Sequence, residues 1–480
     1  MTEHRQHPRR EIPNAPKAER RGFAHKHHGV VVEDPYAWLE DPNYPTVEDA
    51  DILSYLSQEN DYFQAFLAPH CALVSELFEE LKQRKPETDA GVPYLKNGYR
   101  YQWRFNAGDQ YRVWLRQSTI DTSNVWETLL NENSLAEGCE YFRLGALAVS
   151  PDGKKLAYST DTNGSERFIL QVIEIASGNA LTTPIENCAG SVVWNADSDG
   201  FAYRLVNENW RPDKALYRSL LGGDDALLYQ EEDDAFFVGL GLSQSEQLMF
   251  ITSGDHVTSE VRFVPRANLL AEQELIQGRR EGHEYDVEHQ GDSAKTGRLI
   301  IRSNRNHPNF DLFETPMAST EEASWQMLLP GDANHYLMGH VAFADALVVC
   351  LRINGLDQIK IVSGDDSHII EFPEPAYSVD LGTNPNYRTS TLRLAYTSMV
   401  TPHTVFDYDW QTKALTSLKV QEIPGGYEAS DYVSERLQVI ARDGTHVPMS
   451  LVRHKDTLVN GNVPVYLYGY GAYGHAIPPS

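Results

Sequence analysis

A glycine-rich loop late in the sequence has the spacing that most directly suggests chemistry. Gly469-Tyr-Gly-Ala-Tyr-Gly474 satisfies G-x-G-x-x-G, the pattern of turns that bind dinucleotides. That use needs a helix opening at the turn, because its N-terminus meets the pyrophosphate. Pro478 and Pro479 oppose such a helix, and Tyr470 would crowd a pyrophosphate against the backbone. A dinucleotide site is therefore not predicted, and no cofactor is expected.

The same loop fits acyl-transfer chemistry better. It follows Val463-Pro-Val-Tyr-Leu-Tyr468, which we expect to form a buried strand. In α/β-hydrolases the loop after the third strand carries donors that stabilise the oxyanion of the tetrahedral intermediate, and small residues there let the backbone approach the reacting carbonyl. The sequence therefore indicates a hydrolase oxyanion loop.

The elements that would position this loop begin with a helical part, residues 1–85. Thr46 with Asp49 resembles a capping box and opens an amphipathic helix that ends at Pro69. A second helix runs from Leu73 to Leu81. We expect a helical hairpin whose apolar face packs on another domain, because two short helices bury too little surface alone.

Residues 86–421 are predicted to be short strands separated by Gly, Asn, Asp and Pro. The stretch from Leu147 to Tyr158 is echoed from Val192 to Tyr203 and more faintly from Val238 to Phe250. A repeat of about 45 residues with four strands per unit is typical of a β-propeller. A β-sandwich would need far fewer strands, so the fold class is mainly β, with a seven-bladed β-propeller.

Residues 422–480 differ again. The stretch from Val433 to Val452 is expected to form a hairpin that turns at Arg442-Asp-Gly444, because Asp-Gly between alternating strands favours a two-residue turn. With the expected strand before the glycine loop, these residues predict the incomplete start of an α/β-hydrolase domain.

Charge and cysteine usage restrict the function. A formal net charge of -27 argues against nucleic-acid binding, and the acidic run from Glu231 to Asp234 is expected to be a polar loop. The four cysteines lack paired spacing, so neither a zinc site nor a disulfide framework is expected. The first residues form no apolar leader and no long apolar stretch occurs, so a cytoplasmic location without membrane contact is predicted.

Two groups of histidines resemble metal ligands only superficially. His25, His27 and His28 lack suitably spaced acidic or Cys partners. His283 and His289 are six residues apart in a strand region, whereas the helical H-E-x-x-H motif needs them four apart. No metal is expected.

Several stretches resemble the prolyl oligopeptidase family of serine peptidases. Tyr468-Gly-Tyr-Gly-Ala-Tyr-Gly474 is similar to the family's Y-G-Y-G-[GS]-[FY] loop, and Glu33-Asp-Pro-Tyr-Ala-Trp-Leu-Glu-Asp41 to its N-terminal segment. Tyr285-Asp-Val-Glu-His-Gln-Gly-Asp292 and Ala441-Arg-Asp-Gly-Thr-His-Val-Pro-Met-Ser-Leu-Val452 resemble the oligopeptidase B branch. The resemblance implies that Tyr470 donates a hydrogen bond to the oxyanion; the alternative is that it only packs at a strand end.

The resemblance also implies a serine endopeptidase that cleaves short peptides after Arg or Lys, with the propeller excluding folded proteins. Short, basic peptides would be its partners. A prolyl oligopeptidase that cleaves after Pro is the alternative within the family. A propeller that binds peptides or proteins without catalysis is the alternative outside it. The sequence leaves the oligomeric state open.

The catalytic triad is absent from the sequence. Acyl transfer in this fold needs Ser, Asp and His in that order after the oxyanion strand. No G-x-S-x-G occurs in the 480 residues. We therefore expect a truncated or partial sequence whose nucleophile, Asp and His would follow Ser480, and a chain that is inactive by itself.

Overall fold

The computed structural model describes residues 14–44, 46–121, 125–472 and 475–480. The chain divides into two compact units. The first holds the described residues up to Lys85 together with Ile423–Gly426, and the second holds Pro86–Glu422 and Tyr427–Ser480. The three-part division at residues 85 and 421 remains a prediction.

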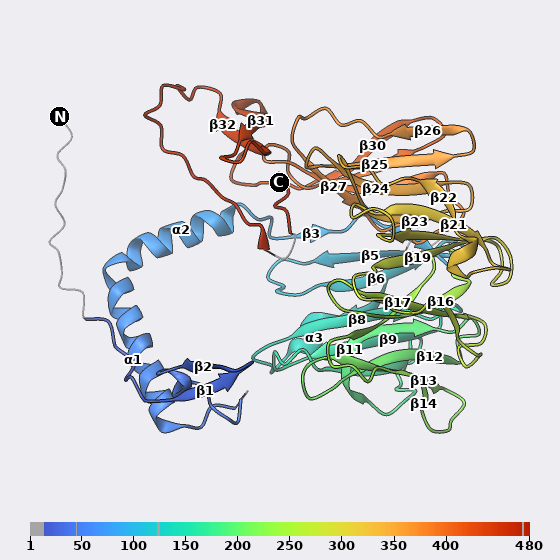
Figure 1. The fold of residues 1–480 in the computed structure, drawn as a ribbon, viewed down its shortest axis with the longest axis horizontal. Helices are drawn as coiled ribbons and strands as arrows, with labels where there is room; N and C mark the ends of the chain where they lie inside the picture. Colours follow the sequence, from blue (N-terminus) through green and yellow to red (C-terminus); the bar gives the residue numbers. More distant parts are fainter. Residues whose placement is uncertain (1–13, 45, 122–124, 473–474) are drawn as a thin grey trace. The chain divides into compact units, whose positions relative to one another are not determined.

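The first unit is a β-ribbon followed by two helices (Figure 1). Its elements in chain order are β1 (Ala24–His27), β2 (Val30–Glu33), the 3-10 helix η1 (Ala37–Leu39), α1 (Ala50–Leu67), the 3-10 helix η2 (Ala68–His70) and α2 (Cys71–Gln83). None of the described helices is long and apolar enough to cross a bilayer.

Helix α1 begins one turn later than the capping-box pattern predicts. Asp49, not Thr46, is its N-cap, and the Asp49 carboxylate accepts hydrogen bonds from the backbone N–H groups of Asp51 and Ile52 at 2.8 and 3.1 Å. The backbone N–H of Asp49 itself donates to the Asp41 carboxylate at 2.9 Å. The segment before the helix is therefore held by a carboxylate that the sequence pattern did not single out.

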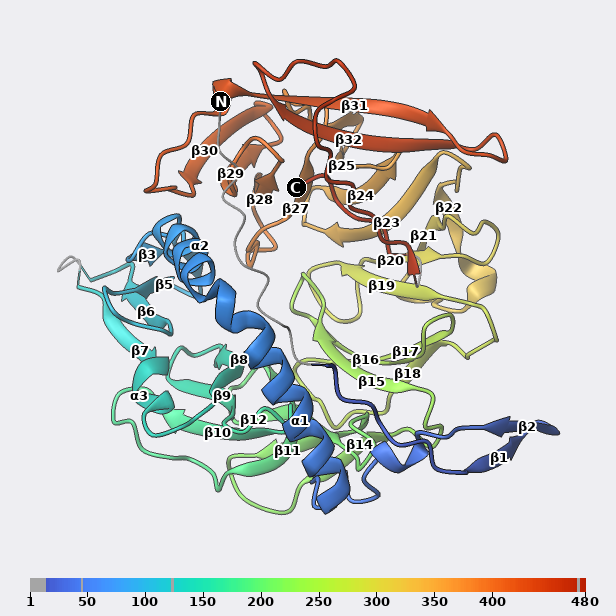
Figure 2. The same cartoon turned by 90° about the vertical axis from the view of Figure 1, so that its left-hand side faces the viewer.

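The predicted helical hairpin is not formed. Both views show α2 continuing from α1 across a bend at η2 instead of folding back along it (Figures 1 and 2). The reason is local: Ala68 and Cys71 both keep right-handed helical dihedral angles, whereas a reversal would require residues with extended or left-handed backbone. Pro69 therefore only bends the chain, because the first turn of a helix tolerates proline.

The second unit is mainly β, and six of its sheets, sheets I to VI in chain order, make up a β-propeller (Figure 2). Sheet I holds β3 (Asp89–Ala90), β4 (Tyr94–Lys96), β5 (Tyr99–Phe105), β6 (Val113–Ser118) and β7 (Glu127–Asn131). Sheet II holds seven strands, β8 (Arg143–Val149), β9 (Lys155–Asp161), β10 (Phe168–Glu174), β11 (Ile185–Trp194), β12 (Gly200–Val206), β13 (Pro212–Ser219) and β14 (Ala226–Gln230).

Sheets III to VI each have four strands. Sheet III holds β15 (Phe237–Leu242), β16 (Leu248–Gly254), β17 (Ser259–Pro265) and β18 (Glu274–Gln277), and sheet IV holds β19 (Tyr285–Gln290), β20 (Arg298–Ser303), β21 (Asp311–Pro316) and β22 (Gln326–Leu329). Sheet V holds β23 (His335–Ala342), β24 (Leu347–Ile353), β25 (Leu356–Ser363) and β26 (Asp366–Ile369), and sheet VI holds β27 (Ser378–Leu381), β28 (Thr391–Thr397), β29 (Thr404–Asp409) and β30 (Ala414–Val420). Short helices α3 (Glu132–Ala136), η3 (Glu322–Ser324) and η4 (Ala429–Asp431) lie between strands.

The repeat seen in the sequence is confirmed as strand, turn and strand. Its three copies become β8–β9, β11–β12 and β15–β16, and each pair is antiparallel. In the first copy Gly153 has a φ of +70° at the turn, where glycine is favoured. The strands and their antiparallel order were therefore predictable, whereas the number of blades remains a prediction because sheet II contains more strands than one blade.

The core lies between the faces of neighbouring sheets. One cluster joins Leu248, Phe250 and Phe263 of sheet III to Leu299 and Ile301 of sheet IV, all almost completely buried. Similar clusters join sheets II and III, IV and V, and V and VI. Each sheet is thus stabilised by the sheets beside it.

The hairpin expected after the propeller is confirmed. β31 (Tyr432–Ile440) and β32 (His446–His454) pair along their whole length, from Tyr432 opposite His454 to Ile440 opposite His446. The loop between them spans five residues, 441–445, rather than the two that Asp-Gly favours, and Gly444 at φ +87° closes it.

Gly297, between β19 and β20, offers a test of how closely this propeller turn is packed. A Cβ atom there would lie 2.1 Å from the Gln290 carbonyl oxygen, and its φ is +91°. We expect Gly297→Ala to lower the free energy of unfolding by at least about 2 kcal/mol, since a non-glycine residue at positive φ already costs about 1–2 kcal/mol. Urea unfolding measures this, and Gly278→Ala, whose Cβ would meet only a side-chain atom at 4.0 Å, is the matched control. Equal stability of the two variants would contradict the expectation.

Candidate functional site

The glycine loop follows the hairpin and leaves Tyr470 accessible. The Tyr470 side chain is 52% exposed, and its ring makes an edge contact with His475 at 5.8 Å between centroids. The backbone N–H of His475 donates to the Ala472 carbonyl at 3.1 Å. Within the described part of the chain, the Tyr470 hydroxyl makes no hydrogen bond. Tyr473 and Gly474, which complete the glycine pattern, lie outside the described residues.

The buried strand expected before the loop is not formed. Residues 463–468 are assigned no strand, and Val465, Tyr466 and Leu467 are 75–89% exposed. An extended segment becomes a strand only when a neighbouring strand bonds to its backbone. None of the described strands pairs with this one. The sequence pattern is typical of a strand, but it cannot show whether a neighbouring strand is present to pair with the segment.

The hairpin that leads to the loop is anchored on the propeller. The Arg436 guanidinium donates to the Asn354 carbonyl in the turn between β24 and β25, and burial lowers the pKa of Arg436. A Cβ atom on Gly355, at φ +71°, would lie 2.9 Å from Pro448. This contact borders a cavity of about 540 Å³ whose lining includes Tyr336, Arg352, Gln438 and His446.

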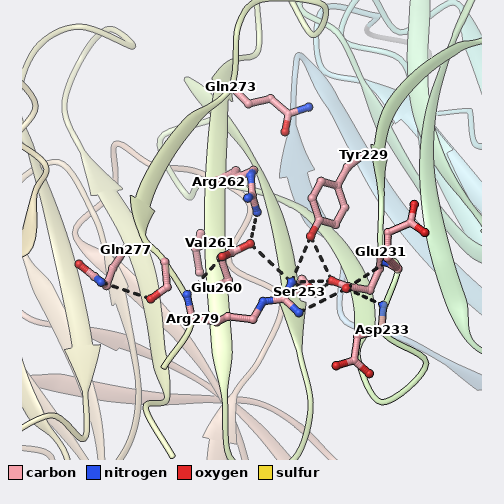
Figure 3. Close-up of polar contacts among 12 residues, drawn as sticks. Tyr229, Glu231, Asp233, Ser253, Glu260, Val261, Arg262, Gln273, Gln277 and Arg279 are labelled. Carbon is pink, nitrogen blue, oxygen red and sulfur yellow. Dashed lines mark hydrogen bonds and ion pairs between the residues drawn. The ribbon is translucent and has the colours of Figure 1, made fainter. Parts of the chain in front are cut away.

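A second polar site, which we call the Glu231 cluster, joins sheets II and III (Figure 3). Glu231 follows β14, and its carboxylate accepts from the Tyr229 hydroxyl at 3.0 Å and from the Ser253 hydroxyl. Arg279, after β18, donates to Glu231 at 2.6 Å and lies 3.6 Å from the carboxylate of Glu260.

Burial and charge compete at Glu231. Burial alone would raise the pKa of its carboxyl, but the Arg279 guanidinium, the Ser253 and Tyr229 hydroxyls and the backbone N–H of Asp233 together lower that pKa to about 2. The Glu231 side chain is only 5% exposed. Since the carboxylate is ionised and all its acceptor positions are used by donors, it can neither give nor take a proton near neutral pH. The cluster therefore has a structural role: it links sheets II and III.

The expectation of a plain polar loop at residues 231–234 is therefore wrong for its first residue. Glu231 is buried, and its partner Arg279 lies 48 positions further along the chain. No local pattern links two residues so far apart, so only the fold could reveal the pair.

The buried histidines of sheet IV are structural. His283 shares a 2.8 Å hydrogen bond with the Ser303 hydroxyl, and His289 bonds the Ser245 hydroxyl at 2.7 Å and the Thr296 carbonyl at 3.0 Å. Burial lowers the pKa of both imidazoles. Across the described part of the chain no three His, Cys, Asp or Glu side chains are grouped to hold a metal ion.

Residues 15–421 match the family model described as prolyl oligopeptidase, N-terminal beta-propeller domain. The chain belongs to the prolyl oligopeptidase family. Among its relatives, dipeptidyl aminopeptidase BI of Pseudoxanthomonas mexicana is 33% identical over 94% of this chain, and protease 2 of Moraxella lacunata is 30% identical over 97%. The structure of oligopeptidase B from Leishmania major superimposes with a TM-score of 0.90 at 25% identity over 97% of this chain and 68% of that one.

These comparisons support the oligopeptidase B branch and identify the relatives as peptidases. The chain spans about two thirds of the length of these curated relatives, 64% of the first and 67% of the second. The family match ends at residue 421, so the hairpin and the glycine loop lie outside it.

Acid should weaken the Glu231 cluster. A depressed folded-state pKa gives stability that is present above the unfolded pKa of about 4.5 and is lost as pH falls toward about 2. We expect Glu231→Gln to be less stable than the parent at pH 7, with a difference that narrows as pH falls from about 4.5. Urea unfolding at several pH values measures this.

Glu232→Gln, at the neighbouring exposed carboxylate, is the control and should leave stability nearly unchanged. A stability difference for Glu231→Gln that stayed constant with pH would show that this carboxylate does not titrate as described.

Proposed function

We propose that this chain is part of a serine endopeptidase that hydrolyses short peptides on the carboxyl side of Arg or Lys. The supporting observation is the Tyr468-Gly-Tyr-Gly-Ala loop, which follows a hairpin anchored on a propeller of the prolyl oligopeptidase family. The peptidase relatives agree with this reaction class.

The proposed chemistry assigns one step to this chain. When a serine hydroxyl attacks the scissile carbonyl, the carbonyl oxygen becomes an oxyanion, and the exposed Tyr470 hydroxyl donates a hydrogen bond to it. The bond strengthens as negative charge develops, so it stabilises the transition state more than the substrate. The 480 residues contain no G-x-S-x-G, and the nucleophile, Asp and His are assigned to none of them.

We propose that the propeller has seven blades, because sheet II can be divided into two blades. In β11, Ile185 pairs with β10, Cys188 pairs with both β10 and β12, and Val192 to Trp194 pair with β12 alone. Asn187 at φ +58° and Gly190 at φ +75° bend the strand between these two parts. β11 thus ends one four-stranded blade and begins the next, and the other five sheets contribute one blade each.

The remaining parts of the proposal follow from charge and redox state. A net charge of -27 steers basic peptides toward the protein at low salt. Cys71, Cys139, Cys188 and Cys350 are all free thiols, which fits a cytoplasmic, reducing compartment.

We assign residues 1–85 to an arm that packs on the hydrolase domain, 86–421 to a propeller that admits only short peptides, and 422–480 to the start of that domain.

Tyr470→Phe tests the assigned step. The substitution is introduced into the gene in the cells that make the protein, and the variant is purified from them. We expect its kcat for an Arg-amide substrate to be about 10²- to 10³-fold lower than that of the parent, with little change in KM, because one oxyanion donor is lost. Steady-state kinetics measures this. Tyr466→Phe, in the same segment and 89% exposed, is the matched control and should keep full activity.

A Tyr470→Phe variant with unchanged kcat would show that Tyr470 only packs at the loop. The 480-residue polypeptide produced alone should not hydrolyse the same substrate, since it lacks the nucleophile motif. Turnover by that polypeptide would overturn this part of the proposal.

Substrate preference distinguishes the alternatives. The relative named dipeptidyl aminopeptidase BI makes release of N-terminal dipeptides a second candidate reaction. We expect the natural protein to cleave an internal Arg bond in a blocked peptide. Cleavage only after Pro would indicate a prolyl oligopeptidase, and cleavage only with a free N-terminus would indicate a dipeptidyl peptidase. Tight peptide binding without cleavage would indicate a binding propeller.

A further inference from the structure

Sheets IV and V, which are neighbours in the ring (Figure 2), leave a cavity between them. Deeper in the core the same sheets are in close contact, and Ile300, Leu312 and Val349 there are almost completely buried. The cavity continues this apolar cluster outward. Its volume is about 490 Å³, within the range of about 300–1,000 Å³ that is usual for small-molecule sites. Because protein interiors contain few voids larger than a water molecule, a space of this size is a candidate binding site.

Strand register places apolar and charged side chains together on the sheet V wall of this cavity. Leu347 of β24 lies opposite Val362 of β25, which in turn lies opposite Ser367 of β26. In the next row Val349 lies opposite Lys360. Residues directly opposite each other in antiparallel strands share a face of the sheet, and all five line the cavity. This wall therefore presents apolar side chains, one hydroxyl and one ammonium group.

The sheet IV wall adds apolar surface and a cation whose charge is already balanced. Leu328 and Leu329 line this wall together with Arg298. The Arg298 guanidinium forms an ion pair with Glu314 and donates to the Gln290 side chain at 2.8 Å. Because the guanidinium is occupied by these two partners, it is not the group that a ligand would need to neutralise.

Lys360 is the cation without a partner at this cavity. The residue is half-buried, and within the described part of the chain its ammonium forms no hydrogen bond or ion pair. Asp345, the one acidic residue among the described residues of the lining, is exposed to solvent, which screens its charge. A partly buried cation loses hydration. An anion that reached Lys360 would replace that hydration with a charge-assisted hydrogen bond.

These walls together indicate the class of ligand. A neutral apolar ligand would leave the ammonium unpaired, a cationic one would be repelled by it, and a polyphosphate would need several free cations. A molecule with an apolar chain and one anionic head fits both walls, because the chain is removed from water while the head pairs with the single free cation.

We propose that this cavity binds an amphipathic carboxylate, such as a medium-chain fatty acid. Its apolar chain lies between sheets IV and V, and its carboxylate accepts a hydrogen bond from the Lys360 ammonium. The cavity borders the start of β24, whereas the Arg436 contact of the hairpin follows the end of that strand, at Asn354. The proposal therefore does not depend on the proposed peptidase function.

Calorimetric titration of the 480-residue chain with decanoate tests this site. We expect saturable binding, and binding of decylamine, which has the same apolar chain but a cationic head, that is at least about tenfold weaker. Lys360→Gln should weaken decanoate binding about tenfold, because a hydrogen bond to a charged group is lost, and should remove most of the preference for decanoate over decylamine. Lys295→Gln, at an exposed lysine between β19 and β20 that does not line the cavity, is the matched control and should leave the affinity unchanged.

A second pair of variants tests the place of the apolar chain. Ser367 is exposed and lines the cavity, so Ser367→Trp should abolish decanoate binding by filling the space, whereas Ser367→Ala at the same position should keep it. Circular dichroism checks the fold of both variants, and the Lys360→Gln result decides alone if Ser367→Trp does not fold.

Three results would overturn the proposal: no binding of decanoate to the parent, equal affinity of the parent and Lys360→Gln, or full binding by a folded Ser367→Trp variant. The assay needs no hydrolysis. A protein without peptidase activity would therefore reject the proposed function and leave this site standing, and a peptidase that does not bind decanoate would do the reverse.

Discussion

The structure depends on apolar contact between the faces of neighbouring sheets. A four-stranded sheet that is apolar on both faces cannot be stable alone in water, because each face must be removed from solvent. Here Leu299 and Ile301 of sheet IV pack on Phe250 and Phe263 of sheet III, and the same arrangement continues into sheets V and VI. Because each sheet from II to V provides a face for the next, these sheets are stabilised by mutual burial rather than by any single sheet's own stability.

Polar side chains then fix how neighbouring sheets are aligned. Three arginines, from β12, β20 and β28, donate to a main-chain carbonyl of the following sheet: Arg204 to Val238 at 2.7 Å, Arg302 to Leu337 at 2.9 Å and, in the segment between β3 and β4, Arg393 to Pro93 at 2.8 Å. Apolar packing is tolerant of sliding, whereas a hydrogen bond to one carbonyl is directional. The last of these bonds joins sheet VI to the segment between β3 and β4 of sheet I, so an arginine–carbonyl bond also links the last sheet to the first.

Local patterns predicted most of the strands because each copy of the repeat contains its own turn signal, such as Pro151-Asp-Gly153 between β8 and β9. Contacts between residues far apart in the sequence could not be predicted from local patterns. The Glu231–Arg279 pair and the Lys96–Glu246 bridge join residues from separate elements, and no spacing rule connects such positions. The sequence predicts a reversal at Pro69 and the structure has a bend, because a helix breaker marks where a helix stops but not the direction of the chain that follows.

At the candidate site too, local patterns were predictable and long-range contacts were not. Tyr470 could be singled out because a glycine-rich loop after an apolar segment is a compact local pattern. The strand expected at residues 463–468 depended on a neighbour, and the exposed Val465 and Tyr466 show what that segment does when none of the described strands pairs with it. Composition defines a strand candidate, but only a partner makes it a strand.

Strand β11 couples the two parts of sheet II directly. Ile185 pairs with β10, Val192 to Trp194 pair with β12, and Cys188 pairs with both. Because one strand bonds to a neighbour on each side, no loop separates the two parts, and fraying of β11 would remove hydrogen-bond partners from β10 and β12 together.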